Sequence, residues 1–119
     1  SGDGYQFDLI NDKLAGASPN IFTYLQCKVA GLNINVAGTT PSLDWRGGAP
    51  LLFLDEMQVD ANFLTSINVD NVAYIKVFRP PFYGASGGSS GAIAIYTRRG
   101  GDAPQAIGTQ AVQALGKDA

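Results

Sequence analysis

The chain has 119 residues, 45% of them apolar, and a net charge of −2. This size and apolar share indicate one globular domain and exclude a disordered chain or a basic surface for nucleic acid, and no apolar run reaches the roughly 18 residues of a transmembrane helix. One cysteine and no histidine exclude an internal disulfide, a zinc site built from both residue types, and the usual histidine-based catalytic triads.

Residues 1–17 are predicted to form a polar lead-in that contains a short strand over Tyr5–Ile10. Ser18 and Pro19 then predict a helix start, with the serine as N-cap and the proline at the first helical position. Gly31 is suited to follow the end of this helix. Four apolar residues at helical spacing are predicted to form the inward face of this helix: Ile21, Phe22, Leu25 and Val29.

Strands are predicted next. The alternation of polar and apolar residues over Leu32–Val36 and over Ser42–Arg46 indicates two strands that each bury one face. The continuous apolar run Leu51–Leu54 predicts a central strand covered on both faces. This run ends at Asp55 and Glu56.

The second half of the chain is again predicted to contain a helix followed by strands. Asp60 is predicted to cap a short helix that turns Phe63, Leu64 and Ile67 inward. A strand over Ala73–Arg79 follows, and we expect the next two prolines to end it, because proline cannot extend a ladder.

A long connection rich in glycine and serine leads to the last clear strand, Ala92–Arg98. One face of this strand carries the two small residues Ala92 and Ala94, which predicts that something packs close to the sheet there. Residues 102–119 are small and polar, and we expect a flexible or weakly helical tail.

Several short motifs follow one another in an order that resembles the plug domain of TonB-dependent outer-membrane receptors, especially the Bacteroidetes type that includes SusC-like proteins. The resemblance covers residues 18–101. The motifs are Gly31-Leu32, Arg46-Gly47, Leu51–Asp55, Val72–Phe78, Tyr83-Gly84, Gly91–Ile93 and Thr97–Gly100.

The resemblance implies an α+β fold, with a small mixed β-sheet and two short helices. It implies a non-catalytic plug on the periplasmic side of the outer membrane, which occludes a β-barrel and gates substrate uptake. The implied partners are a β-barrel of the same or a larger protein and the TonB complex, and an isolated plug would self-associate. The alternative is a plug-like interaction module without a barrel, in a larger cell-envelope protein similar to alpha-2-macroglobulin.

The sequence departs from this family pattern at several points. Glu56 stands where a glycine is expected, so we expect that this turn does not use a positive-φ position. Pro80, Pro81 and Phe82 stand where small residues are common. We find no TonB-box segment, signal peptide or barrel-forming segment in the 119 residues, and therefore expect an excised plug or a plug-like domain.

No candidate chemistry is convincing. A phosphate loop needs Gly-Lys-Ser/Thr entering a helix, whereas a strand follows this glycine-rich segment. Asp55 and Glu56 are adjacent and would point to opposite faces of a strand, so a solvated turn is predicted instead of an acid–base pair. Asp44 and Arg46 would share a strand face and pair there with each other or with a neighbouring strand. We expect no catalytic residue, cofactor or metal, and no chemistry from Cys27.

The aromatic residues are the best binding candidates, although a place in the core is the favoured interpretation for most of them. Phe82 and Tyr83, with Ser86 and Ser89, are predicted to contact a ligand or partner because they lie in the connection after the prolines. By resemblance to the family, structural roles are predicted for Gly31, Arg46, Gly47, Asp55, Gly84, Gly91, Thr97 and Arg98.

Overall fold

A five-stranded sheet with the strand order β1-β6-β7-β4-β5 is the main element of the fold. The computed structural model describes residues 4–84 and 87–99. Within these residues β4 and β7 form the parallel pair, and the other neighbours in this sheet are antiparallel. The strands are β1 (Gly4–Asp8), β4 (Leu51–Leu54), β5 (Met57–Val59), β6 (Val72–Phe78) and β7 (Ala92–Thr97).

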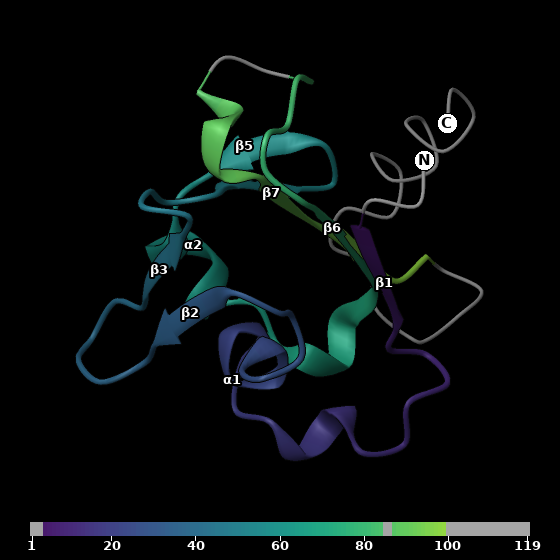
Figure 1. The fold of residues 1–119 in the computed structure, drawn as a ribbon. Helices are drawn as coiled ribbons and strands as arrows, with labels where there is room; N and C mark the ends of the chain where they lie inside the picture. Colours follow the sequence, from purple (N-terminus) through teal and green to yellow (C-terminus); the bar gives the residue numbers. More distant parts are fainter. Residues whose placement is uncertain (1–3, 85–86, 100–119) are drawn as a thin grey trace.

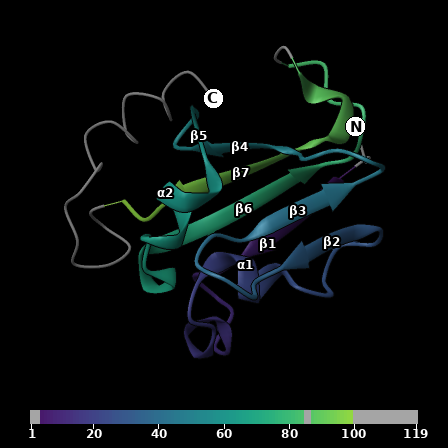
Figure 2. The same cartoon turned by 90° about the vertical axis from the view of Figure 1, so that its left-hand side faces the viewer.

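In the described part of the chain, the remaining elements other than the short 3₁₀ turn between β6 and β7 gather on one side of this sheet, and no described helix or strand covers its other side (Figures 1 and 2). They include an antiparallel hairpin of two strands, β2 and β3. Their bounds are η1 (Ala15–Ala17), α1 (Ile21–Leu25), β2 (Leu32–Asn35), β3 (Ser42–Trp45), α2 (Ala61–Thr65), η2 (Val69–Asn71) and η3 (Gly88–Ser90). The mixed sheet with two short helices confirms the predicted fold class.

The core lies between the sheet and this layer. Alternate residues of β6 and β7 point into it, and both helices contribute apolar side chains from the opposite side. The largest fully buried side chains are Phe22, Ile21, Leu25, Leu64, Ile75, Ile93, Ile95, Val72 and Val77. Among the described residues, no helix has the length and apolar character needed to cross a membrane.

The strands predicted at 5–10, 32–36, 42–46, 73–79 and 92–98 are confirmed with small shifts of their ends. The strand β1 falls within the predicted lead-in and pairs along its whole length with β6. The predicted tail lies outside the described residues.

The start of the first helix was predicted at the wrong residue. Asn20, not Ser18, is its N-cap, and the Asn20 side chain accepts a hydrogen bond from the Thr23 N–H at 3.0 Å. Serine and asparagine are almost equally good caps, so the sequence does not distinguish them. The helix also ends early, because Gln26 leaves the helical conformation and Cys27 adopts φ 65°.

Two burial predictions were wrong. In β4 only Leu52 is buried, because the other face of the strand belongs to the open side of the sheet. In α2 the Asp60 cap is confirmed, since its side chain accepts from the Phe63 N–H at 2.8 Å. The Phe63 side chain, however, is 49% exposed, because only one face of this five-residue helix meets the core, and that face carries Leu64.

The turn after β4 also differs from the prediction. Asp55 and Glu56 form the tip of the β4–β5 hairpin with φ values of 47° and 72°, although neither is glycine. A two-residue turn in which both central residues have positive φ matches the right-handed twist of the two strands of a hairpin. The twist therefore imposes on Glu56 a backbone conformation that glycine adopts at lower cost.

Candidate functional site

The segment from Arg79 to Gly91 joins β6 to β7 and folds back over the end of the sheet. The N–H groups of Phe82 and Gly91 both donate to the Gly88 carbonyl, at 2.6 and 3.1 Å. The peptide bond between Pro80 and Pro81 is cis. Because β6 and β7 are antiparallel neighbours, the prediction that this segment connects two paired strands is confirmed.

Phe82 is the apolar centre of this segment. Its ring contacts Phe78 and Phe53, with centroid distances of 5.1 and 6.2 Å. Ala92 lies opposite Phe78 and Ala94 lies opposite Phe53 in the sheet, so the Phe82 ring covers the small face of β7. This contact explains the alanines on that face.

The segment is attached to the β2–β3 hairpin by two residues. Trp45 is 2% exposed, and a Cβ placed on Gly91 would lie 3.1 Å from the Trp45 ring and 2.6 Å from the Phe78 carbonyl oxygen. The next residue, Arg46, donates a hydrogen bond from Nη1 to the Pro80 carbonyl at 3.1 Å. Asp44 and a neighbouring strand were the predicted partners of Arg46, but Arg46 lies past the end of β3 and its side chain binds the β6–β7 segment, which directly follows β6.

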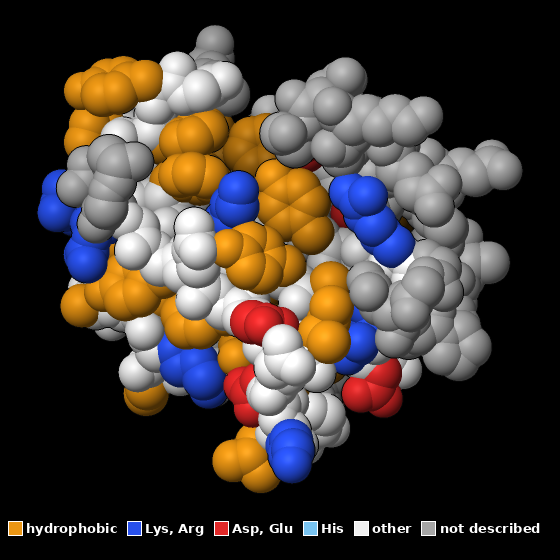
Figure 3. All heavy atoms as spheres, turned by 90° about the vertical axis from the view of Figure 1, so that its right-hand side faces the viewer, with side chains coloured by type: hydrophobic (Ala, Val, Ile, Leu, Met, Phe, Trp, Pro, Cys, Tyr) orange, Lys and Arg blue, Asp and Glu red, His pale blue; other side chains and the backbone are white. Residues whose placement is uncertain are grey.

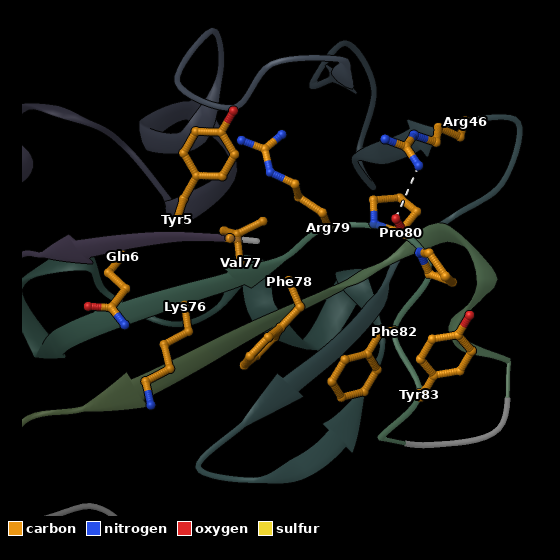
Figure 4. Close-up of a pocket in the computed structure, with 12 residues that line it drawn as sticks. Tyr5, Gln6, Arg46, Lys76, Val77, Phe78, Arg79, Pro80, Phe82 and Tyr83 are labelled. Carbon is orange, nitrogen blue, oxygen red and sulfur yellow. Dashed lines mark hydrogen bonds between the residues drawn. The ribbon is translucent and has the colours of Figure 1, made fainter. Parts of the chain in front are cut away.

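A groove of about 780 Å³ lies beside this attachment (Figure 4). Three of the side chains that line it are cationic, and none is acidic. Figure 4 shows Arg79, Arg46 and Tyr5 on one side of β6, whereas Lys76 points to the other side. The lining residues are Gly4, Tyr5, Gln6, Arg46, Lys76, Val77, Phe78, Arg79, Pro80, Pro81, Phe82 and Tyr83.

The open face of the sheet is the second notable surface. Hydrophobic side chains gather on this side of the molecule with basic side chains among them (Figure 3). The Nζ of Lys76 lies 5.9 Å from the ring centroids of both Tyr74 and Tyr96, in cation–π geometry. Beside this trio lie Phe53, Phe78 and Phe82. Tyr83, at 89% exposure, extends the aromatic surface toward the groove.

The carboxylates of the β4–β5 turn bind the end of β7. Asp55 accepts hydrogen bonds from the backbone N–H and the hydroxyl of Thr97, at 3.0 and 2.8 Å. Glu56 accepts from the Tyr96 hydroxyl at 3.3 Å. Burial, and then the Glu56 charge, raise the pKa of the Tyr96 phenol. Asp55 is thus structural and half-buried, not a member of a solvated turn as predicted.

The four predicted contact residues do not form one site. Tyr83 is exposed and Phe82 is half-buried, and both line the groove. Ser89 is exposed in the middle of the segment's 3₁₀ turn, and Ser86 lies outside the described residues. Ligand contact by these residues stays a prediction.

Most of the residues for which structural roles were predicted make contacts that link separate elements of the fold. Gly31 and Gly91 both lie against the Trp45 ring, Arg46 binds Pro80, and Asp55 binds Thr97. Gly84 lies against the Phe82 ring, because a Cβ added to Gly84 would overlap that ring. Arg98 donates from Nε to the Asp70 carbonyl at 2.7 Å, and Gly47 follows Arg46 in the turn after β3.

Sequence reasoning missed the groove and two of its residues, Arg79 and Tyr5. The Arg79 guanidinium lies 4.8 Å from the Tyr5 ring centroid, although the two residues are distant in sequence. Pairing β1 with β6 from their patterns would have brought them together, but a five-residue strand does not reveal its partner. In the described part of the chain, we find no group of three side chains suited to hold a metal ion.

Comparison with known structures decides the fold. The RagAB peptide importer in its open-open state matches 82% of this chain with a TM-score of 0.63 and 23% identity. The ferric enterobactin receptor PfeA of Pseudomonas aeruginosa matches 83% with a TM-score of 0.62 and 17% identity. The siderophore receptor PirA of the same organism matches 83% with a TM-score of 0.56 and 19% identity.

The chain has the fold of a TonB-dependent receptor plug domain. The chain spans only 12%, 18% and 19% of the lengths of the three matched chains, respectively. No protein-family model and no curated protein sequence matches it. Since all three identities are below a quarter, the likeness defines the fold, and peptides and siderophores are cargo of those other proteins.

Proposed function

We propose that this domain is the plug of a TonB-dependent receptor in the outer membrane. In this role it fills the lumen of a β-barrel from the periplasmic side, blocks passage, and opens a path when the TonB complex acts on it. The plug fold, shared over more than four fifths of the chain with receptors such as the RagAB importer, supports this proposal most directly.

The distribution of polar and apolar surface supports the same role. One face of the central sheet is covered by helices and the β2–β3 hairpin, and the opposite face presents tyrosine and phenylalanine rings (Figures 2 and 3). Large exposed aromatic surfaces on small domains mark sites of contact with another protein surface. We assign this face, with Tyr83 at its margin, to contact with the barrel wall.

The occlusion step is tested in the parent protein by single-channel conductance in planar bilayers. We expect the intact protein to hold a low conductance, and a variant without residues 18–101 to show large stable openings. A Leu14→Ser variant, changed at a residue that is 79% exposed and not part of the aromatic face, keeps the plug and serves as the control, with conductance near that of the intact protein. Equal conductance with and without the plug, or a parent chain that forms no pore, would overturn the proposal.

The orientation of the aromatic face is tested separately by labelling. In a Cys27→Ser background, a cysteine introduced by Tyr83→Cys is exposed in the isolated domain. We expect it to react quickly with a maleimide in the isolated domain and slowly in the assembled receptor. A cysteine introduced at Ser42, on the β2–β3 hairpin away from this face, provides the comparison. Equally fast labelling of Tyr83→Cys in both forms would remove this face from the contact surface.

A further inference from the structure

One face of the central sheet is aromatic, and no helix or strand within residues 4–84 and 87–99 covers it (Figure 2). The Nζ of Lys76 lies between the rings of Tyr74 and Tyr96 on this face, and the two ring centroids are 6.5 Å apart. The Phe82 ring packs at the other end of β6, on Phe78. An aromatic sheet face on a small domain normally packs against another apolar element.

The chain itself continues beside this face. Tyr96 is the last residue but one of β7, and β7 stands in the middle of the sheet. Residue 100 follows Tyr96 by four positions, so it lies at most about 14 Å away. A segment tethered at such a distance is present at an effective concentration of about a millimole per litre, which favours it over a second copy of the chain in dilute solution.

Residues 100–119 carry the sequence pattern of one amphipathic helix. Asp102 is a preferred N-cap residue, Gln105 completes a capping box, and Gly116 is suited to follow the last turn. Three apolar residues recur at every fourth position and would share one face of this helix: Ile107, Ala111 and Leu115. The opposite face would be polar, with Thr109, Gln110 and Gln113.

The dimensions and charges of the two surfaces agree. A helix over residues 103–115 is about 20 Å long at about 1.5 Å per residue. The strand β6 has seven residues and spans about the same length at about 3.3 Å per residue. A helix that returns from the end of β7 would start near Asp8, which lies opposite Tyr74 in the sheet. Because a helix N-terminus carries partial positive charge, the Asp8 carboxylate favours this direction.

We propose that residues 103–115 form a helix that packs on this face of the sheet, with its apolar side against Tyr74 and Tyr96. The helix shields the aromatic rings from other surfaces while the domain is not docked, and it leaves Tyr83 uncovered at the groove. This intramolecular cover goes beyond the proposed function and does not depend on it. Only the displacement of the helix by a barrel wall rests on that function, because both would occupy the same face.

The contact is tested by nuclear magnetic resonance of the 119-residue chain with labelled methyl groups. We expect nuclear Overhauser effects from the methyl groups of Ile107 and Leu115 to the rings of the two tyrosines on the face, Tyr74 and Tyr96. The Thr109 methyl group lies on the opposite side of the helix and should show none. A mixture of labelled and unlabelled chains then separates contacts within one chain from contacts between two chains.

A matched pair of substitutions tests whether the apolar side holds the helix on the sheet. Ile107→Asp and Thr109→Asp introduce the same charge, but only the first would enter the contact. A cysteine placed by Lys76→Cys in a Cys27→Ser background reports the accessibility of the face to a maleimide. We expect Ile107→Asp to speed labelling about tenfold, since the loss of one buried isoleucine is sufficient for this. Thr109→Asp should change the rate by about twofold at most.

Contacts found only between different chains would identify a second copy as the occupant and overturn the proposal. The absence of contacts from Ile107 and Leu115, or equal labelling rates in the two aspartate variants, would overturn it as well. None of these results bears on the conductance test of the plug role, because that test deletes residues 18–101 and leaves residues 103–115 in place.

Discussion

The Asp55 carboxylate accepts hydrogen bonds from the backbone N–H and the hydroxyl of Thr97, at 3.0 and 2.8 Å, and so links the β4–β5 turn to the end of β7. This contact secures the end of the parallel β4–β7 pair, where the ladder stops at Leu54 and Ile95. Two charge-assisted hydrogen bonds to a half-buried carboxylate stabilise more than an exposed ion pair. Asp55 is therefore expected to matter for stability although it is not part of the core.

We expect Asp55→Ala to lower the free energy of unfolding by about 2 kcal/mol, because two bonds are lost and the Thr97 donors remain. Thr97→Val should lower it by about 1 kcal/mol, and Thr97→Ser, which keeps the hydroxyl, should stay within about 0.5 kcal/mol of the original chain. Urea denaturation measures all three. An Asp55→Ala chain as stable as the original would contradict this account of the contact.

Gly91 is predicted to be the least replaceable glycine in the β6–β7 segment. Its φ is 83°, and an added Cβ would lie 2.6 Å from the Phe78 carbonyl oxygen, a distance that backbone atoms do not accommodate. We expect Gly91→Ala to cost about 3 kcal/mol or more in the free energy of unfolding, through strain and overlap together.

Gly47 is the matched control for this substitution. It has a similar φ of 89°, but a Cβ there would meet no atom within 4 Å. Gly47→Ala should therefore cost only about 1–2 kcal/mol, the penalty of the left-handed conformation alone. Equal losses in urea denaturation would show that overlap at Gly91 is relieved by movement of the segment.

Glu56 offers a stabilising substitution. Its φ of 72° is unfavourable for a residue with a Cβ, and Asp-Gly is the preferred pair in such a turn. We expect Glu56→Gly to raise the free energy of unfolding by about 0.5–1 kcal/mol, despite loss of the exposed bond from Tyr96. Glu56→Ala loses the same bond and keeps the strain, so it should give no gain. A gain with alanine would point to removal of the charge as the cause.

Tyr24 is predicted to make the fold sensitive to alkali. Burial, followed by the hydrogen bond to Asp12, raises the pKa of its phenol to about 12. The Tyr24 hydroxyl donates to Asp12 Oδ2 at 2.7 Å, and this bond in turn lowers the pKa of Asp12. A raised pKa of the folded state means that the associated stability is complete below about pH 10, the usual tyrosine value, and is lost between there and about pH 12.

We expect urea denaturation at increasing pH to show a loss of stability in this window, and Tyr24→Phe to remove most of it. The phenolate absorbance of the five tyrosines should also show a late step that becomes smaller in Tyr24→Phe but does not vanish, because the pKa of Tyr96 is raised as well. Tyr83→Phe, at an exposed position, is the control and should leave the late step unchanged. A late step that persists in Tyr24→Phe at full amplitude would contradict the assignment.

The sequence predicted the sheet better than the contacts around it. Alternation and apolar runs define β2, β3, β6 and β7, because a strand with one buried face must repeat every second residue. The same patterns do not reveal that β7 lies between β6 and β4, or that one face of β4 is open. Which strands are neighbours in a sheet depends on pairing between distant parts of the chain, and the local sequence pattern of a strand does not identify its partner.

The candidate site was less predictable for a related reason. Tyr83 was predicted from its place beside prolines and glycines, and it is exposed. The pairing of Arg46 with Pro80 and of Arg79 with Tyr5 depends on a turn at φ 55° and on the register of β1. Charged residues at strand ends normally indicate solvated surface, so the sequence alone does not predict that these two arginines line one groove.

The position of β7 also has a consequence for biosynthesis. It is the last described strand in the chain, yet it stands in the middle of the sheet, between strands that are made earlier. Until Ala92–Thr97 is in place, the domain can form only two separate strand groups, β1–β6 and β4–β5, whose inner edges are unpaired. Such edges can pair with other chains, so we expect the newly made polypeptide to be prone to association until β7 is inserted.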